Sequence, residues 1–287
     1  MSFPRVALES TVLAHGLPHP HNHHLAHDLD SIVRDAGAIP ITIGYINGVE
    51  CIGLSDDEIS MMCVDPSVQK VSIRDIPRVV ARGLHGATTV ATTIRSASRA
   101  GINVMATGGI GGVHRDAQGQ PSSDISADLR QLALSPMTVV CSGPKAILHL
   151  EATREHLESL GISVVGYKTD TMPAFYCENS PYAVDVRCDT PSEIADLTRA
   201  RDAADLPQSI LVVNPLPASM ALSFERVQEV VTDALSSTAA QALKPAEVTP
   251  FLLNHVRQEI GDRALTANVE LLKRNAALAA AIASELH

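Results

Sequence analysis

The chain has 287 residues, of which 45% are hydrophobic, which is enough to bury a large core. Its net charge is −10, aromatic residues make up 3%, and Trp is absent, which argues against nucleic acid as the main partner. No run approaches the roughly 18 apolar residues of a membrane span, no signal peptide is recognisable, and the five cysteines form no CxxC pair, so we expect a cytoplasmic protein that binds no membrane.

Short apolar runs alternate with helical patterns through the first half of the chain. Asn47-Gly48 separates two strand-like runs and is a typical hairpin turn. The spacing of apolar residues predicts strands at 6–10, 38–46, 49–54, 68–73 and 102–106, and helices at 22–36, from 55 onwards, and at 86–101.

The same alternation continues through the second half. Strands are predicted at 137–142, 162–167, 182–188 and 209–215, and helices at 124–134, at 144–161 and over most of 224–287. This order is typical of an α/β fold. We therefore expect a single domain over 1–287, built as a three-layer α/β/α sandwich around a central mixed sheet.

Glycine is dense in TGGIGGVHR, residues 107–115, directly after the predicted strand at 102–106. Glycines let backbone N–H groups approach a ligand closely, and loops of this kind often hold a phosphate. The stretch matches neither the Walker pattern nor GxGxxG. The alternative interpretation is a tight crossover with no ligand.

Lys145 follows Pro144, where a helix is predicted to begin. A cation at that end opposes the helix dipole, and the buried strand before it adds a desolvation cost. Both effects favour the neutral, nucleophilic amine, so Lys145 is a candidate for a Schiff base with a carbonyl carbon. The alternative is a lysine whose ammonium simply reaches water.

Two carboxylates, Asp124 and Asp128, are four residues apart in DISAD and would share one face of the predicted helix. A divalent cation or a lysine between them would relieve their repulsion. The alternative makes Asp124 the helix cap and Asp128 an ordinary acid of the first turn.

Glu9 ends the first predicted strand, and active sites of α/β sheets gather at the carboxyl ends of strands. It is a candidate general acid, although a glutamate there is often only solvated. The six histidines of 15–27 include an i,i+4 pair at His23 and His27 but lack an acidic third ligand, so we do not expect a metal there.

Taken together, the motifs resemble the pseudouridine-5′-phosphate glycosidase family, also called indigoidine-synthase-A-like proteins. The combination of TGGIGGVHR with DISADL is the most specific part of the resemblance. The matching runs occur in family order along nearly the whole chain: ALESTVLAHGLPHPHN, GLSDDEI, QKVSIRDIP, GATTVATTI, ATGGIGGVHR, DISADL, VVCSGPKAIL, GYKTDTMPAF, TPFLL and TANVELL.

This resemblance implies reversible cleavage of the C–C bond between C1′ of ribose 5-phosphate and C5 of uracil. By the family pattern Lys145 is the nucleophile that forms an iminium at C1′, Glu9 is the proton donor that opens the ring, and Asp128 is implicated in catalysis. Asp124 matches a metal ligand, normally for Mn²⁺, and the family assembles as a homotrimer. The implied substrate-binding residues are Lys70, Val90, Thr107, Gly108, Gly109, Ser126, Ala127, Asp128 and Asn268, with Thr107 and the glycines at the phosphate.

The chain departs from the family around this set. Ile73 stands where the family has an arginine, Leu84-His85 replaces a Lys-Asn pair, and residues 176–179 lack an arginine. His149 stands where Asp is preferred. The pattern indicates the same ribose 5-phosphate chemistry with a changed partner for C1′.

Two alternatives to pseudouridine 5′-phosphate cleavage remain open. One is a C-glycosynthase that joins ribose 5-phosphate to an aromatic acceptor in antibiotic biosynthesis, as family members in pathways such as that of alnumycin do. The other is an inactive subunit that only binds a sugar phosphate, which the presence of Lys145, Glu9 and Asp128 argues against.

Overall fold

The structure, a computed structural model, describes residues 3–237, 248, 251–252, 255–256, 258–259 and 261–287. Its first half comprises β1 (Arg5–Glu9), η1 (Val12–Gly16), α1 (His21–Asp35), β2 (Ile39–Ile46), β3 (Val49–Ile52), α2 (Asp56–Val64), β4 (Gln69–Val71), η2 (Ile73–Asp75), α3 (Ile76–Ala81), β5 (Gly86–Thr88), α4 (Val90–Arg99) and β6 (Val104–Ala106). Its second half comprises β7 (Val113–Arg115), β8 (Pro121–Ile125), α5 (Ala127–Leu134), β9 (Thr138–Cys141), α6 (Leu150–Ser159), β10 (Ser163–Tyr167), β11 (Val186–Cys188), α7 (Pro191–Ala203), β12 (Ile210–Val213), α8 (Phe224–Ser236) and α11 (Asp262–Glu285).

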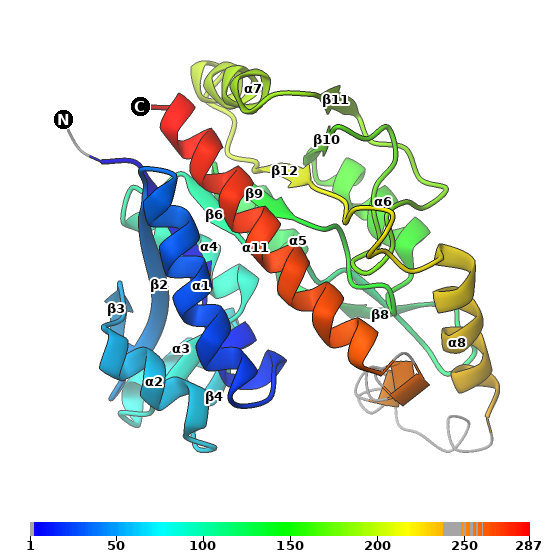
Figure 1. Cartoon of the computed structure of the whole chain (residues 1–287), viewed down its shortest axis with the longest axis horizontal. Helices are drawn as coiled ribbons and strands as arrows, with labels where there is room; N and C mark the ends of the chain where they lie inside the picture. The colour runs from blue at the N-terminus through cyan, green and yellow to red at the C-terminus, as the bar shows by residue number, and fades with distance from the viewer. Residues whose placement is uncertain (1–2, 238–247, 249–250, 253–254, 257, 260) are drawn as a thin grey trace.

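A large mixed sheet organises the fold (Figure 1). Within the described residues its order is β11-β10-β12-β9-β6-β1-β2-β5-β4, with β3 paired to β2. Strands β11 to β2 are parallel, whereas β3 and β5 run antiparallel to β2 and β4 is parallel to β5. The predicted hairpin is confirmed, because Asn47 and Gly48 both have positive φ between β2 and β3.

The reversal at β5 brings two sets of strand ends to one place. Glu9, the last residue of β1, pairs with Ile43 in the middle of the longer strand β2. Thr88, the last residue of the oppositely directed β5, donates its hydroxyl to the Ile43 carbonyl at 2.7 Å. The carboxyl ends of β1 and β5 therefore meet beside the same residue of β2.

Two hydrophobic layers cover the two faces of the sheet. Val6 and Leu8 of β1 pack with α1, α7 and α11, while the intervening Ala7 packs with α4, α5 and α6. This alternation is the period of two expected for a strand buried on both faces. Figure 1 shows α1 and α11 side by side across one face. The predicted three-layer α/β/α sandwich around a mixed sheet is confirmed.

Several helix starts were predicted too early. Asp124 lies in β8, which pairs with β7, and α5 begins only after Ser126, whose hydroxyl caps the Asp128 N–H at 3.2 Å. The helix expected from Pro144 begins at Leu150. Residues 86–88 form β5 before α4. The last predicted helical region contains α8 and α11, and part of the chain between them lies outside the described residues.

No helix in the described part of the chain is long and apolar enough to cross a membrane. The cytoplasmic location stays a prediction.

Candidate active site

Five of the predicted residues lie around the converging strand ends. Glu9 ends β1, Lys70 is in β4, Thr107 follows β6, Asp128 is in the first turn of α5 and Lys145 follows β9. Their charges act on one another: Lys145 and Asp128 both influence the pKa of Glu9, and Lys145, Asp128 and Glu9 all influence the pKa of Lys70. The structure thus assembles two lysines and two carboxylates from four separate elements.

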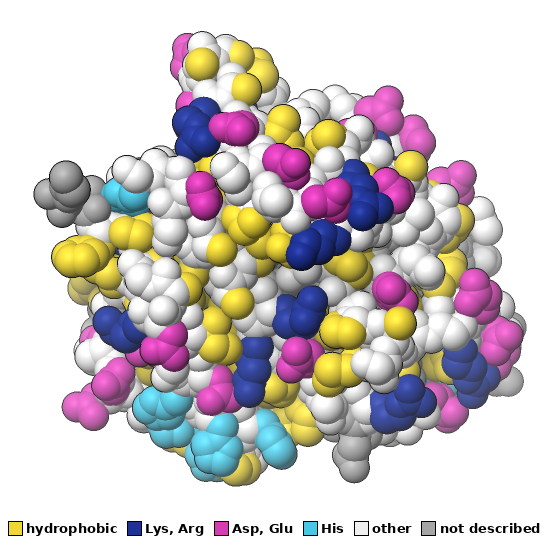
Figure 2. All heavy atoms as spheres, turned by 45° about the horizontal axis from the view of Figure 1, so that its top comes forward, with side chains coloured by type: hydrophobic (Ala, Val, Ile, Leu, Met, Phe, Trp, Pro, Cys, Tyr) yellow, Lys and Arg dark blue, Asp and Glu magenta, His cyan; other side chains and the backbone are white. Residues whose placement is uncertain are grey.

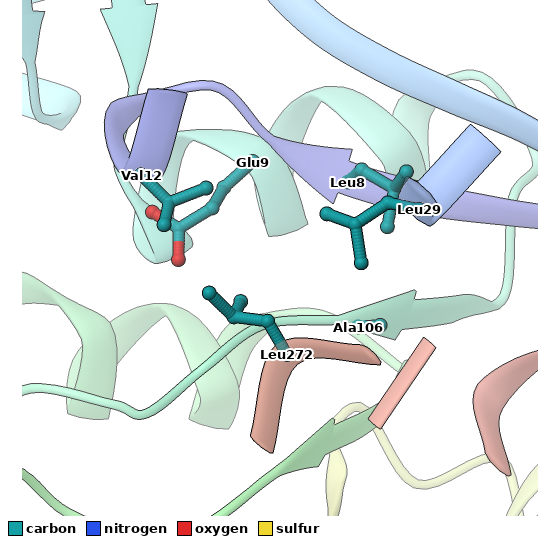
Figure 3. A pocket seen from close by; sticks show the side chains of 6 residues that line it. All are labelled: Leu8, Glu9, Val12, Leu29, Ala106 and Leu272. Atoms are coloured by element: carbon teal, nitrogen blue, oxygen red, sulfur yellow. The ribbon is translucent and has the colours of Figure 1, made fainter. Parts of the chain in front are cut away.

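The Glu9 carboxylate is held by two hydroxyl groups. Thr107 donates to one of its oxygens and Thr11 to the other. Figure 3 shows Glu9 among apolar neighbours that include Val12 and Leu272. Burial raises the pKa of Glu9, whereas the two hydroxyl donors and the Lys145 charge partly counteract that rise. A carboxyl whose pKa is raised retains its proton closer to neutral pH, which suits a general acid.

The two lysines stand in different surroundings. Burial lowers the pKa of Lys70, and the nearby Lys145 charge lowers it further, while Asp128 and Glu9 act in the opposite direction. Lys145 lies in a turn, so the argument from a helix dipole was wrong. The backbone there is held by contacts far away in sequence: the Lys145 N–H donates to the Ile110 carbonyl at 3.1 Å, and the His149 N–H donates to the Val113 carbonyl at 2.9 Å.

Asp128 braces three segments of the site. One carboxylate oxygen accepts the Ala91 N–H of α4 at 2.9 Å, and the other accepts the Gly111 N–H at 2.8 Å. Only 7% of the residue is exposed. Each oxygen retains further lone-pair capacity, so Asp128 can still face a substrate group or Lys70 while it holds the site together.

The glycines of 107–112 serve close packing. A Cβ on Gly109 would lie 2.6 Å from the Phe175 ring and 2.9 Å from the Gly143 carbonyl, and one on Gly108 would lie 3.1 Å from Leu271. At Gly111 it would collide with the Ser126 side chain. Residues 107–112 are buried, and the Gly111 N–H already donates to Asp128. That one N–H is therefore not available to a phosphate, and the phosphate site at this loop stays a prediction.

The remaining predicted residues surround this centre. Val90 is the first residue of α4, and the preceding Thr89 has a buried hydroxyl without a hydrogen-bond partner. Ser126 and Ala127 cap and begin α5, close to Gly111. Asn268 lies in α11, three residues before the Leu271 side chain that packs on Gly108.

Asp124 lies further out, exposed in β8, and does not share a helix face with Asp128. Burial lowers the pKa of the nearby His114, and the charge of Asp124 counteracts part of that decrease. In the described ranges no group of three or more His, Cys, Asp or Glu could hold a metal together. A metal at Asp124 would therefore take most of its ligands from water or substrate.

The histidine-rich stretch of residues 15–27 runs from the end of η1 into α1, and several histidine side chains lie together at the lower edge of the face in Figure 2. The His23 and His27 rings meet edge to face at 4.7 Å, and the His23 Nε2 lies 3.1 Å from the Ser60 hydroxyl. On the face that Figure 2 displays, basic and acidic side chains are interspersed. That the stretch binds no metal stays a prediction.

Sequence reasoning missed a buried polar network behind Glu9. The Asn275 amide of α11 donates to the Thr107 carbonyl at 2.8 Å and to the Ser142 hydroxyl at 3.1 Å. Its oxygen accepts from the Asn214 amide at 3.1 Å. The network ties α11 to the ends of β6, β9 and β12. The signal in the sequence was a single asparagine within the Ala- and Leu-rich run that ends the chain.

Comparison with known proteins then decides the family. The model of the indigoidine synthase A like protein family matches residues 2–285. The chain belongs to the indigoidine synthase A-like family. The resemblance predicted from the motifs is confirmed.

The chain is similar to proteins of named activity and known structure. A pseudouridine-5′-phosphate glycosidase of Symbiobacterium thermophilum is 46% identical over 285 residues, covering 99% of this chain and 92% of the relative. An indigoidine synthase A-like protein from Thermotoga maritima has a TM-score of 0.90 at 34% identity, covering 99% of this chain and 93% of its own. The prealnumycin C-glycosynthase AlnA, solved in complex with ribulose 5-phosphate, has a TM-score of 0.91 at 35% identity, covering 99% and 91%.

Proposed function

We propose that the protein is a C–C glycosidase that cleaves pseudouridine 5′-phosphate reversibly to uracil and ribose 5-phosphate. The observation that carries the proposal is Glu9, partly buried with a raised pKa, beside Lys145 at the converging strand ends. A C–C glycosidic bond has no leaving-group oxygen to protonate, so a pair of carboxylates alone would not suffice. The combination of an acid with an amine supplies what this bond requires. The similarity to pseudouridine-5′-phosphate glycosidases supports the proposal.

Glu9 and Lys145 share the steps of the reaction. Protonated Glu9 gives its proton to the ribose ring oxygen, and the neutral Lys145 Nζ attacks C1′ as the bond from C1′ to that oxygen breaks. The secondary ammonium that forms at Lys145 returns a proton to the Glu9 carboxylate. Glu9 then protonates C5 of uracil while the Lys145 lone pair forms a C=N bond and the C1′–C5 bond breaks. Water adds to the iminium carbon and gives a proton to Glu9, and loss of the protonated amine from that carbon releases ribose 5-phosphate and restores Lys145.

We place the 5′-phosphate beside Lys70 and the first turn of α4. A helix N-terminus attracts anions, and α4 begins with Val90 there, although its Ala91 N–H already donates to Asp128. The buried, unpartnered hydroxyl of Thr89 is a donor available to a phosphate oxygen. Thr107 and the glycine-rich loop then enclose the sugar rather than the phosphate.

A trapping experiment tests the nucleophile. Borohydride added during incubation with ribose 5-phosphate reduces the iminium and should add the mass of the sugar phosphate at Lys145. Lys145→Ala should abolish both labelling and turnover, while Lys168→Ala, which changes a lysine stacked on Tyr167, serves as control. An adduct at Lys70 or Lys168 instead would refute the assignment, and absence of any adduct would favour an inactive sugar-phosphate-binding subunit.

We propose that Asp124 holds a hydrated divalent cation, with Mn²⁺ as the resident ion. A single exposed carboxylate fits a hard cation that retains several waters. Such an ion would supply positive charge to the substrate. Calorimetric titration with Mn²⁺ should show binding to the wild type and its loss in Asp124→Asn, with Asp57→Asn as a control on the exposed start of α2. Equal binding by both variants would overturn the proposal.

We also propose a homotrimer, as the family resemblance implies. Light scattering coupled to size exclusion should give three times the chain mass of 30.4 kDa. A monomeric mass would contradict it.

The second candidate is a C-glycosynthase that attaches ribose 5-phosphate to an aromatic acceptor of an antibiotic pathway. The likeness to AlnA and the departures from the family pattern favour it. The structure weakens one departure: Leu84 packs against Tyr45, Val71 and Val79, so its apolar character is explained by a core cluster. Ile73, the first residue of η2 after β4, and the exposed Glu178 remain as differences.

Steady-state kinetics on pseudouridine 5′-phosphate distinguishes the two candidates. A kcat/KM of roughly 10⁴ M⁻¹s⁻¹ or more lies in the ordinary range for enzymes and would establish the glycosidase. Turnover far below this range, with C-ribosylation of a bulkier aromatic acceptor from ribose 5-phosphate, would establish the synthetic candidate.

A further inference from the structure

The segment of residues 144–149, here called the Lys145 loop, is not part of a helix, so its conformation depends on outside contacts. Two of its carbonyl groups are held by side chains from other elements. The Gln228 amide of α8 donates to the Ala146 carbonyl at 3.1 Å. The Arg115 guanidinium of β7 donates to the Leu148 carbonyl at 3.2 Å. Two side-chain hydrogen bonds thus hold the backbone just after Lys145, at the first and the third residue beyond it.

The two side chains also bind each other. A second Arg115 nitrogen donates to the Gln228 amide oxygen at 2.9 Å, and a third donates to the Gly119 carbonyl at 3.3 Å. All three guanidinium nitrogens of Arg115 are therefore used. Burial lowers the pKa of Arg115, and none of the acceptors named here is a carboxylate.

Such a partly buried cation is costly when its partners are neutral. Moving a charge out of water is only partly offset by hydrogen bonds to carbonyl oxygens, so stability alone would be served as well by an apolar side chain. What Arg115 does provide is a fixed geometry, because its rigid planar guanidinium holds three acceptor oxygens at set angles to one another. The loop, α8 and the turn between β7 and β8 are locked in one arrangement by this guanidinium.

Apolar packing supports the same contact. Ala146, Ile147 and Leu148 are all but fully buried and belong to one cluster with Val227 and Val230 of α8. The Leu235 side chain of α8 reaches the β7–β8 turn at Gly119. The apolar contacts hold α8 against the Lys145 loop. The two polar side chains fix the directions of the Ala146 and Leu148 carbonyl groups.

We propose that Arg115 and Gln228 are positioning residues for Lys145. They form a clamp on the Lys145 loop that keeps the lysine amine directed at C1′ of the substrate. The inference rests on the proposed function of Lys145 as the nucleophile. In the described part of the chain the side-chain hydrogen bonds of Arg115 and Gln228 go to Ala146, Leu148, Gly119 and each other, and not to Lys70 or α4. We therefore expect the clamp to affect the reaction rather than binding of the phosphate.

The deciding variant is Gln228→Glu. It keeps an oxygen acceptor for Arg115 and adds an ion pair, but it places a carboxylate oxygen against the Ala146 carbonyl where an N–H had donated. Misplacing a reacting group by about 1 Å costs up to roughly 100-fold in rate. We expect kcat and the rate of borohydride trapping at Lys145 to fall about 10-fold or more, with KM within about twofold of wild type.

Arg115→Lys is the second variant, because a lysine keeps the charge but its compact ammonium cannot span the three acceptors that the planar guanidinium reaches from three separate nitrogens. It should show the same split between kcat and KM. Since both side chains hold one loop, the double variant should be little slower than the slower single variant. Arg226→Lys and Glu229→Gln, which change an exposed ion pair on the same helix α8, are the matched controls and should match the wild type.

The outcomes are distinct. Wild-type trapping at Lys145 with unchanged trapping and kcat in both variants would overturn the clamp while leaving the proposed function intact. A parallel loss of kcat, substrate affinity and thermal stability would show a merely structural role and also overturn it. If the wild type is not labelled at Lys145, the proposed function fails and the clamp with it. If Gln228→Glu does not fold, Arg115→Lys decides.

Discussion

Replacing Asn275 by alanine tests whether the buried network behind Glu9 contributes what its geometry indicates. The side chain is fully buried and makes three close hydrogen bonds. In Asn275→Ala, the Thr107 carbonyl loses its donor and the Asn214 amide loses its acceptor. The Ser142 hydroxyl still donates to the Asn214 carbonyl at 2.9 Å, so it keeps a hydrogen-bond partner.

Two buried groups without partners cost about 1–3 kcal/mol each, or roughly 2–6 kcal/mol together. Alanine is the better helix former by up to about 0.7 kcal/mol, which offsets a small part of this loss. We therefore expect Asn275→Ala to lower the free energy of unfolding by about 2–5 kcal/mol. For a chain of this size that corresponds to a Tm lower by about 5–15 °C.

Urea unfolding followed by circular dichroism, together with calorimetry, measures the effect. The control is Asn103→Ala, an exposed asparagine before β6, which should change stability by less than about 0.5 kcal/mol. A loss below about 1 kcal/mol in Asn275→Ala would refute the reasoning that both groups are left unsatisfied.

Three further predictions concern the same site. Because burial raises the pKa of Glu9 above its ordinary 4.5, the folded state binds the proton more tightly than the unfolded state; this stabilisation is complete below pH 4.5 and is lost as the pH rises through the folded pKa. Glu9→Gln should thus be inactive yet gain stability relative to wild type as the pH rises, and a pH-independent difference in calorimetry would contradict this. Gly109→Ala should lower the free energy of unfolding by about 1–3 kcal/mol through overlap with Phe175, and an unchanged urea midpoint would count against it. Asp128→Asn should cost about 1–3 kcal/mol, because one carboxylate oxygen facing an N–H, such as that of Gly111, becomes an NH₂ group; unaltered thermal unfolding would show that these bonds are dispensable.

The sequence predicted what depends on local pattern. Short apolar runs, the Asn47-Gly48 turn and the order of strands and helices were sufficient for the α/β class, and the motifs were sufficient for the family. The charged residues Glu9, Lys70 and Asp128 were identified from their places at strand ends and in motifs.

The parts that were mispredicted depend on contacts between distant segments. Pro144 is a good local start for a helix, but the backbone of residues 145–149 binds Ile110 and Val113 instead of completing helical turns. Asp124 resembled a helix cap because pairing of β8 with β7 is not visible in its own neighbours. The assignment of the glycines to a phosphate stays a prediction, whereas their close packing against Phe175 and Leu271 is invisible to local pattern because those residues are distant in sequence.

The bond between Asn275 and Thr107 spans 168 positions of the chain, and the bond between Thr107 and Glu9 spans 98. Contacts of such high sequence separation form late, because a long loop must close before they contribute any stabilisation. The Thr107 carbonyl, behind the acid at the end of the first strand, therefore gains its partner only when α11 docks. In a refolding experiment we expect recovery of activity to be the slowest signal, behind the recovery of secondary structure.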